Sequence, residues 1–214
     1  MPNQKIEIKL KNNCIEIEID NQKFDCAFFD LKRCFNSDFE VKRNSVDTNS
    51  KSCKEEIFII SAYYPYHTDI RDTLSKLIVY NKKEKEVNSR RILQEIFYWY
   101  ITCVAQELTK SEILIPMPGT HNNPSKDFFP QLDSITLYLS RKLGIPAYIN
   151  TIKKDSIENF SPSTESHKIK NKKILIIEDV ITSGKTLNDC YQILKKLHAK
   201  EVNALVIGKT IHEK

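Results

Sequence analysis

The chain has 214 residues, a length that suits one domain with an appendage, and 40% of its residues are hydrophobic. The sequence shows no long apolar run and no apolar core of a signal peptide, so we expect a cytoplasmic protein with no membrane partner. Its net charge of +5 is compatible with a polyphosphate or a nucleic acid, but scattered lysines favour an ordinary solvated surface. Its six cysteines form no CxxC pair and no zinc-type spacing with histidine, so no zinc module is predicted.

Residues 1–54 are expected to form a β-rich appendage to a main domain over residues 55–214. Apolar and charged residues alternate over 6–10 and again over 15–19, which predicts two strands with a turn between them. An isolated hairpin is only marginally stable, so we expect these strands to pack on the main domain, on further strands or on a partner.

In the main domain, strands and helices alternate along the chain. Strands are predicted at 57–64, 113–115, 147–152, 174–177 and 202–207, and helices at about 70–78, 89–108 and 129–143 and from 187 onward. This alternation predicts an α/β fold, a parallel sheet with helices on both faces. The polar stretch 153–171 is either a surface loop or a flexible hood over a site.

The predicted helix 89–108 carries an aromatic cluster at 97–100. At helical spacing, such a cluster belongs more often to a core or an interface than to a platform for stacking bases. We take this helix as the candidate surface for a homodimer.

The segment 172–187 combines an apolar strand, a polar turn and the start of a helix. Glu178 and Asp179 stand where the predicted strand ends. The turn that follows contains hydroxyls, a glycine and a lysine: Thr182, Ser183, Gly184, Lys185 and Thr186. Backbone N–H groups and the positive end of a helix converge on such a turn, which suits a phosphate.

A nucleotide-binding P-loop is the obvious competing interpretation, because the turn contains a Gly-Lys-Thr triplet. The P-loop pattern needs another glycine where Asp179 stands, and a carboxylate there would repel the phosphates. The P-loop interpretation is therefore rejected.

Residues 178–187 instead resemble the 5-phosphoribosyl-1-pyrophosphate (PRPP) motif of type I phosphoribosyltransferases, which has two acids, two apolar residues and a hydroxyl-rich loop with glycine. The resemblance implies that residues 182–186 bind the 5-phosphate. It implies that Glu178 and Asp179 are catalytic, accepting hydrogen bonds from the ribose hydroxyls and favouring a developing oxocarbenium ion. Mg²⁺ would be held mainly by the pyrophosphate and hydroxyl oxygens, with no metal ligand directly from the protein.

Residues 60–208 are more closely similar to competence-protein F (ComF-type) phosphoribosyltransferases, which have an apolar strand ending in Pro-x-Pro, as at 115–118. That family's N-terminal cysteine zinc module is absent, and arginines usual after Pro-x-Pro are replaced. The similarity implies a pyrophosphate loop that begins at residue 117. The candidate pyrophosphate contacts are Met117, Gly119, Thr120, His121, Lys126 and, from the segment 153–171, Lys168.

Two functions follow from this resemblance. The first is transfer of ribose 5-phosphate from PRPP to a nitrogen acceptor, expected to be a nucleobase, with release of pyrophosphate. The second is non-catalytic sensing of PRPP or a nucleotide, with a nucleic-acid or nucleoprotein partner, as in DNA uptake or retron-type anti-phage defence. No residue stands out as a base for an acceptor.

Overall fold

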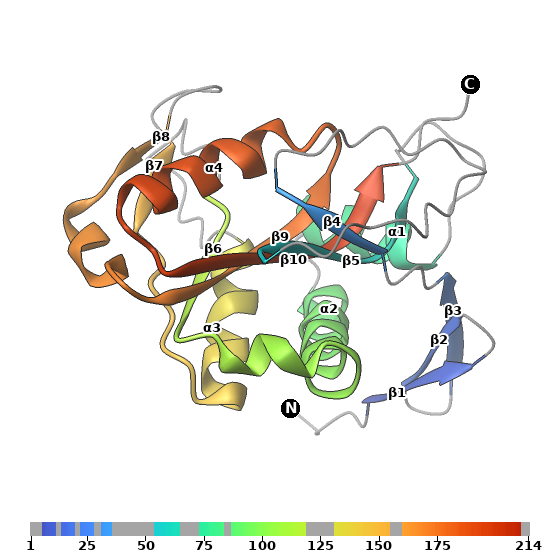
Figure 1. Ribbon diagram of the computed structural model, residues 1–214. Coiled ribbons are helices and arrows are strands. Elements are labelled where there is room, and N and C mark those ends of the chain that lie inside the picture. The colour runs from blue at the N-terminus through green and yellow to red at the C-terminus, as the bar shows by residue number, and fades with distance from the viewer. Residues whose placement is uncertain are drawn as a thin grey trace.

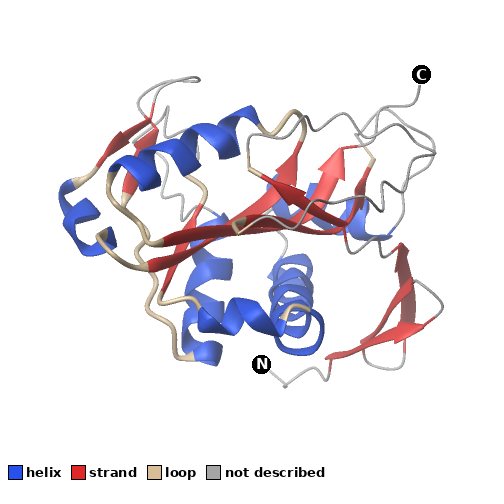
Figure 2. Ribbon diagram, in the orientation of Figure 1, coloured by secondary structure: helices blue, strands red, loops and turns tan. Residues whose placement is uncertain are grey.

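The computed structural model describes residues 6–11, 14–19, 22–27, 31–35, 54–64, 73–83, 87–118, 131–154 and 160–210. Its centre is a five-stranded sheet in the order β4-β5-β10-β9-β6 (Figures 1 and 2). These strands are β4 (Leu31–Cys34), β5 (Glu56–Tyr63), β6 (Ile113–Pro116), β9 (Lys173–Ile181) and β10 (Glu201–Thr210). All pairs are parallel except the pair of β4 with β5, which is antiparallel.

Helices cover both faces of this sheet, which confirms the predicted α/β fold class. One face packs against α1 (Thr73–Lys83), α2 (Val87–Trp99) and α3 (Gln131–Leu143), and the other against α4 (Lys185–Lys196). In β9, Leu175 and Ile177 point to the first face, and Ile174 and Ile176 to the second. Both kinds of position are buried, which explains why the strand is a continuous apolar run.

The single α-helix predicted at 89–108 is wrong. The α-helical part ends at Trp99, and a π-helical turn η1 (Tyr100–Val104) and a 3-10 helix η2 (Gln106–Lys110) follow. The hydroxyl of Thr102 donates to the carbonyl of Tyr98 at 2.9 Å, and the backbone turns at Ala105. Apolar spacing does not distinguish these windings, because Tyr100 and Leu108 are fully buried in either case.

The two N-terminal strands and their turn are confirmed as β1 (Ile6–Lys11) and β2 (Cys14–Ile19), which pair antiparallel. A third strand, β3 (Gln22–Ala27), completes a separate sheet, whose buried Ile15 and Ile17 pack with the cluster beneath α1 and α2. By contrast β4 joins the main sheet, although its residues lie within 1–54. The domain boundary at residue 54 stays a prediction.

The strand predicted at 147–152 is also wrong. Only Ala147 pairs with β6, through one bridge to Leu114, because a turn at 149–150 ends the pairing. The stretch after it is more regular than predicted: β7 (Ile152–Lys154) and β8 (Phe160–Pro162) pair antiparallel, and a 3-10 helix η3 (Thr164–Ile169) follows. None of the described helices is long and apolar enough to cross a membrane.

Candidate phosphate-binding site

The two polar loops singled out from the sequence start side by side at one edge of the main sheet. Pro116, the last residue of β6, pairs with Ile177 of β9. The next N–H, that of Met117, donates to the carbonyl of Ile177 at 2.8 Å. The first loop therefore begins next to Glu178, as expected at the carboxyl edge of a parallel sheet.

The acid pair lies inside β9 and not at its end. Pairing with β10 continues through Glu178 to Ile181, four residues beyond the predicted end, because β10 itself extends to Thr210. Both carboxylate residues are half-buried, and Glu178 Oε1 accepts a hydrogen bond from the N–H of Asp179 at 2.9 Å. The strand thus holds the acids on a rigid element.

Glu178 lies on the face of the sheet that α4 covers. It pairs in register with Val206 of β10, whose side chain belongs to the same buried cluster as Cys190 and Leu194 of α4. Burial raises the pKa of the Cys190 thiol, and the negative charge of Glu178 raises it further. The N-terminus of the same helix follows the polar loop.

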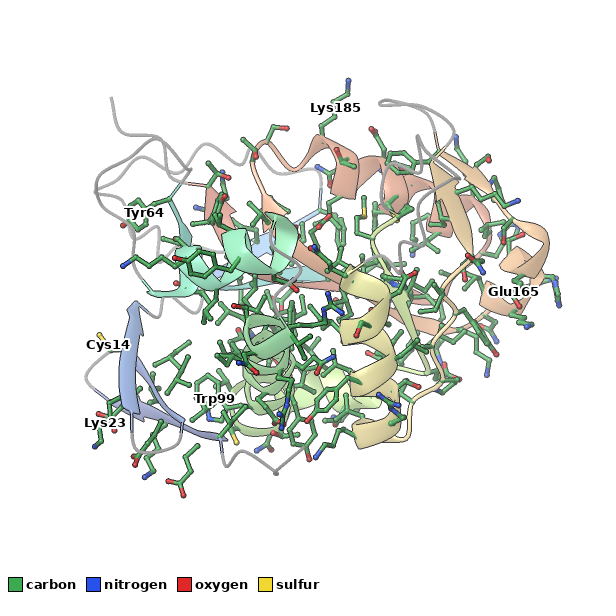
Figure 3. All side chains as sticks on the ribbon, turned by 180° about the vertical axis from the view of Figure 1, so that it is seen from behind. Cys14, Lys23, Tyr64, Trp99, Glu165 and Lys185 are labelled. Atoms are coloured by element: carbon green, nitrogen blue, oxygen red, sulfur yellow. The ribbon has the colours of Figure 1, made fainter. Side chains whose placement is uncertain are left out.

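The loop between β9 and α4 has the geometry of an anion site. Thr182, Ser183, Lys185 and Thr186 are exposed, whereas Gly184 is buried and has a left-handed φ of 75°. That conformation favours glycine, because a Cβ would crowd the backbone. The hydroxyl of Ser183 accepts from the N–H of Lys185 at 3.3 Å, and Figure 3 shows the Lys185 side chain projecting outward.

Sequence reasoning missed one residue of this loop's surroundings, Lys209 of β10. Its Nζ donates to the carbonyl of Thr182 and, at 3.2 Å, to that of Thr210, and the hydroxyls of the two threonines lie 3.3 Å apart. Lys209 is only 6% exposed. The available signal was a lysine directly after an apolar strand, but the strand was predicted to end before it.

The pyrophosphate side is defined less fully. The Met117 side chain is buried in the cluster beneath α4, so its backbone is the part of this residue left to face a ligand. Gly119, Thr120, His121 and Lys126 lie outside the described residues.

Among the described residues, the side-chain contacts of Lys168 are with Glu165 and Tyr148 and not with another predicted site residue. Its ammonium pairs with Glu165 at 2.9 Å and lies 4.8 Å from the centre of the Tyr148 ring. Helix η3, which holds both charged residues, precedes the start of β9, and Figure 3 shows Glu165 far from Lys185.

Comparison with known proteins agrees with this local geometry. Residues 138–213, which include β9, the loop, α4 and β10, match the sequence model of the phosphoribosyl transferase domain. This part of the chain is therefore similar in sequence to phosphoribosyl transferase domains. Over 150 residues the chain is 27% identical to competence protein F of Haemophilus influenzae, covering 61% of this chain and 66%, just under two thirds, of that protein. The predicted relationship to ComF-like phosphoribosyltransferases is thereby confirmed.

Solved structures of phosphoribosyltransferases align with parts of the chain. A purine phosphoribosyltransferase from Pyrococcus horikoshii aligns with 21% identity and a TM-score of 0.36, covering 56% of this chain and 87% of that one. A hypoxanthine-guanine phosphoribosyltransferase from Bacillus anthracis aligns with 16% identity and a TM-score of 0.40, covering 58% and 80%.

Proposed function

We propose that the phosphoribosyltransferase-type domain binds PRPP and transfers its ribose 5-phosphate to a nitrogen acceptor, with a nucleobase as the favoured class. One observation carries the proposal: the half-buried acid pair of β9 is separated by only Val180 and Ile181 from the loop 182–186 at the N-terminus of α4. A phosphate in the loop would place the attached ribose next to the acids.

The loop supplies what a phosphate dianion needs. The first N–H groups of the twelve-residue helix α4 have no partner within the helix, and the helix dipole is positive at that end. Three hydroxyls and the Lys185 ammonium stand around them on exposed residues. Charge-assisted hydrogen bonds from these groups would hold the 5-phosphate.

In the proposed reaction, the bond between C1 of the ribose and the pyrophosphate oxygen breaks, and its electron pair leaves with pyrophosphate. A lone pair of the acceptor nitrogen forms the new bond to C1, and the proton that this nitrogen loses passes to the solvent. The carboxylates of Glu178 and Asp179 would accept hydrogen bonds from the ribose hydroxyls and stabilise positive charge that develops on the ribose.

The acid pair also fits a magnesium ion that arrives with PRPP. Mg²⁺ prefers oxygen ligands, which PRPP and water would supply, and the half-buried carboxylates of Glu178 and Asp179 would attract the ion by their negative charge. The described residues contain no group of three or more side chains that could hold a metal alone, so most ligands would come from PRPP and water. The ion would supply positive charge to the leaving pyrophosphate.

Calorimetric titration with PRPP and Mg²⁺ tests the binding. We expect the wild type to bind and the double variant Glu178→Gln/Asp179→Asn to bind about tenfold more weakly or worse, because two charged acceptors are lost. Glu165→Gln removes a carboxylate far from the loop and should leave the affinity unchanged. Absence of PRPP binding to the wild type would refute the proposed function.

Pyrophosphate release over a panel of nucleobases then tests turnover. Binding without release would favour the second candidate, a PRPP or nucleotide sensor with a nucleic-acid or nucleoprotein partner. The absence of arginine from residues 119–122, within the proposed pyrophosphate loop, is the observation that favours this candidate.

We also propose that the protein works in the cytoplasm as a homodimer. Cys14, Cys103 and Cys190 are free thiols, which fits the reducing cytoplasm. Tyr98 and Trp99 of α2 are half-buried and are the remaining aromatic candidates for a homodimer surface. Light scattering should give twice the mass of the chain, and a monomer would contradict that assembly.

A further inference from the structure

The side chain of Lys209 reaches the phosphate loop from inside the protein. The loop residues 182–186 approach a ligand from the solvent side, whereas Lys209 comes from β10, the strand next to β9. Its Nζ is bonded to the carbonyl of Thr182, the first residue of the loop, and to that of Thr210. The ammonium therefore lies directly behind the loop.

Burial of this ammonium costs free energy when no anion lies beside it. A buried charge needs compensation, and carbonyl oxygens solvate an ammonium without neutralising it. Burial lowers the pKa of Lys209, and the positive charge of Arg33 in β4 lowers it further. Within the described part of the chain, no carboxylate contributes to this balance, and the buried Nε of Arg33 has no hydrogen-bond partner.

We propose that Lys209 is a positioning residue for the phosphomonoester: it holds the Thr182 carbonyl away from the ligand and supplies a buried positive charge behind the bound phosphate. This inference rests on the proposed function of the loop. A carbonyl oxygen turned toward the phosphate would repel it, so its bond to Lys209 favours the binding shape of the loop. A bound dianion would in turn offset the charge that the described residues leave uncompensated.

Ribose 5-phosphate is the probe that isolates this half of the site, and pyrophosphate with Mg²⁺ is the probe for the other half. Lys209→Met keeps most of the side-chain length and removes the charge. We expect it to weaken ribose 5-phosphate about tenfold or more, with pyrophosphate within about twofold of the wild type. Lys172→Met removes one charge before the start of β9, 2.8 Å from its partner Glu112, and should change neither affinity.

A folded Lys209→Met protein that binds ribose 5-phosphate as the wild type does would overturn the inference. An equal loss for both probes would also overturn it, because that result indicates a general structural role. Lys209→Arg, which keeps the charge, should recover part of the ribose 5-phosphate affinity. If the wild type binds neither PRPP nor ribose 5-phosphate, the proposed function fails first, so the two failures are distinguishable.

A measurement on the wild type decides the matter if the variants do not fold. In protein labelled with ¹³C at the lysine Cε atoms, Lys209 should titrate below the ordinary lysine range. Saturating ribose 5-phosphate should raise that midpoint by about one pH unit or more, because a nearby dianion favours the ammonium. Pyrophosphate should leave it unchanged, and a midpoint that ribose 5-phosphate does not move would overturn the inference.

Discussion

The lysines at the edge of the main sheet where β9 begins (the first edge) have different partners from the lysine at the edge where β9 ends (the second edge). At the first edge Lys172 pairs with Glu112 at 2.8 Å, and Lys168 pairs with Glu165 at 2.9 Å. At the second edge the buried ammonium of Lys209 contacts carbonyl oxygens. The first edge is made of ordinary exposed ion pairs, whereas the second holds a charge in a costly state, which is typical of a binding site.

The comparison also shows why residue type alone does not identify a phosphate contact. The sequence assigns Lys185 to the 5-phosphate and Lys168 to the pyrophosphate. Lys185 opens α4 after the carboxyl end of β9, but Lys168 lies in η3 before the strand begins. Lys185 therefore lies at the end of β9 that carries the loop, and Lys168 lies before its other end.

The largest expected effect concerns a carboxyl in the first turn of α3, where burial raises the pKa of Asp133 from 3.8 to about 6. An acid with a raised pKa binds more protons in the folded state, so the free energy of unfolding falls as the pH rises through that window. Asp133→Asn removes this loss. We expect it to raise the free energy of unfolding by up to about 3 kcal/mol at pH 7 and far less at pH 4, as measured by urea unfolding.

Glu112, at the first edge, is the matched control, because its pKa is lowered whereas that of Asp133 is raised. Hydrogen bonds from Lys172 and from the N–H of Lys173 lower its pKa below 4.5. Its stabilisation is therefore present above pH 4.5 and lost as the pH falls, so Glu112→Gln should destabilise the protein only at the higher pH. An Asp133→Asn protein no more stable than the wild type at pH 7 would contradict the contrast between these edges.

Two left-handed glycines give the next largest effect. Gly184 in the phosphate loop has φ 75°, and Gly144 after α3 has φ 71°. At Gly144, no atom lies within 4 Å of the place that a Cβ would take. Alanine at either site should cost about 1–2 kcal/mol of unfolding free energy. Only Gly184→Ala should also weaken ribose 5-phosphate, about tenfold, because it distorts the loop. Equal binding by both variants would show that the loop shape is irrelevant.

The sequence predicted those parts of the site that depend on local pattern. The apolar run 174–177, the acids after it and the loop glycine are contiguous, so their order alone predicts strand, turn and helix. Lys209 could not be found in this way, because its contact with the loop is a hydrogen bond to the carbonyl of Thr182, which is distant along the chain. A polar residue after an apolar strand looks exposed until its neighbours are known.

The fold was predictable to a similar extent. The alternation of elements indicated the parallel sheet, since each buried strand and each apolar helix stripe is a local signal. The winding of residues 100–110 was not predictable, because the buried residues Tyr100, Ile101 and Leu108 also fit the apolar stripe of a single α-helix. The hairpin of β7 and β8 was missed because three-residue strands give too short a pattern.

The smallest expected effect is the change in ribose 5-phosphate affinity when Lys185 or Lys168 is replaced. Lys185→Met should weaken ribose 5-phosphate about fivefold, or about 1 kcal/mol, and the difference from the wild type should shrink at high salt, because the residue is exposed. Lys168→Met should leave the affinity within about twofold, since its ammonium is already paired with Glu165, and an exposed pair of this kind contributes at most about 1 kcal/mol to stability. Calorimetry at two salt concentrations measures both. If Lys168→Met were the weaker binder, the segment 153–171 would have to close over the phosphate, and the contrast between the two edges would not hold.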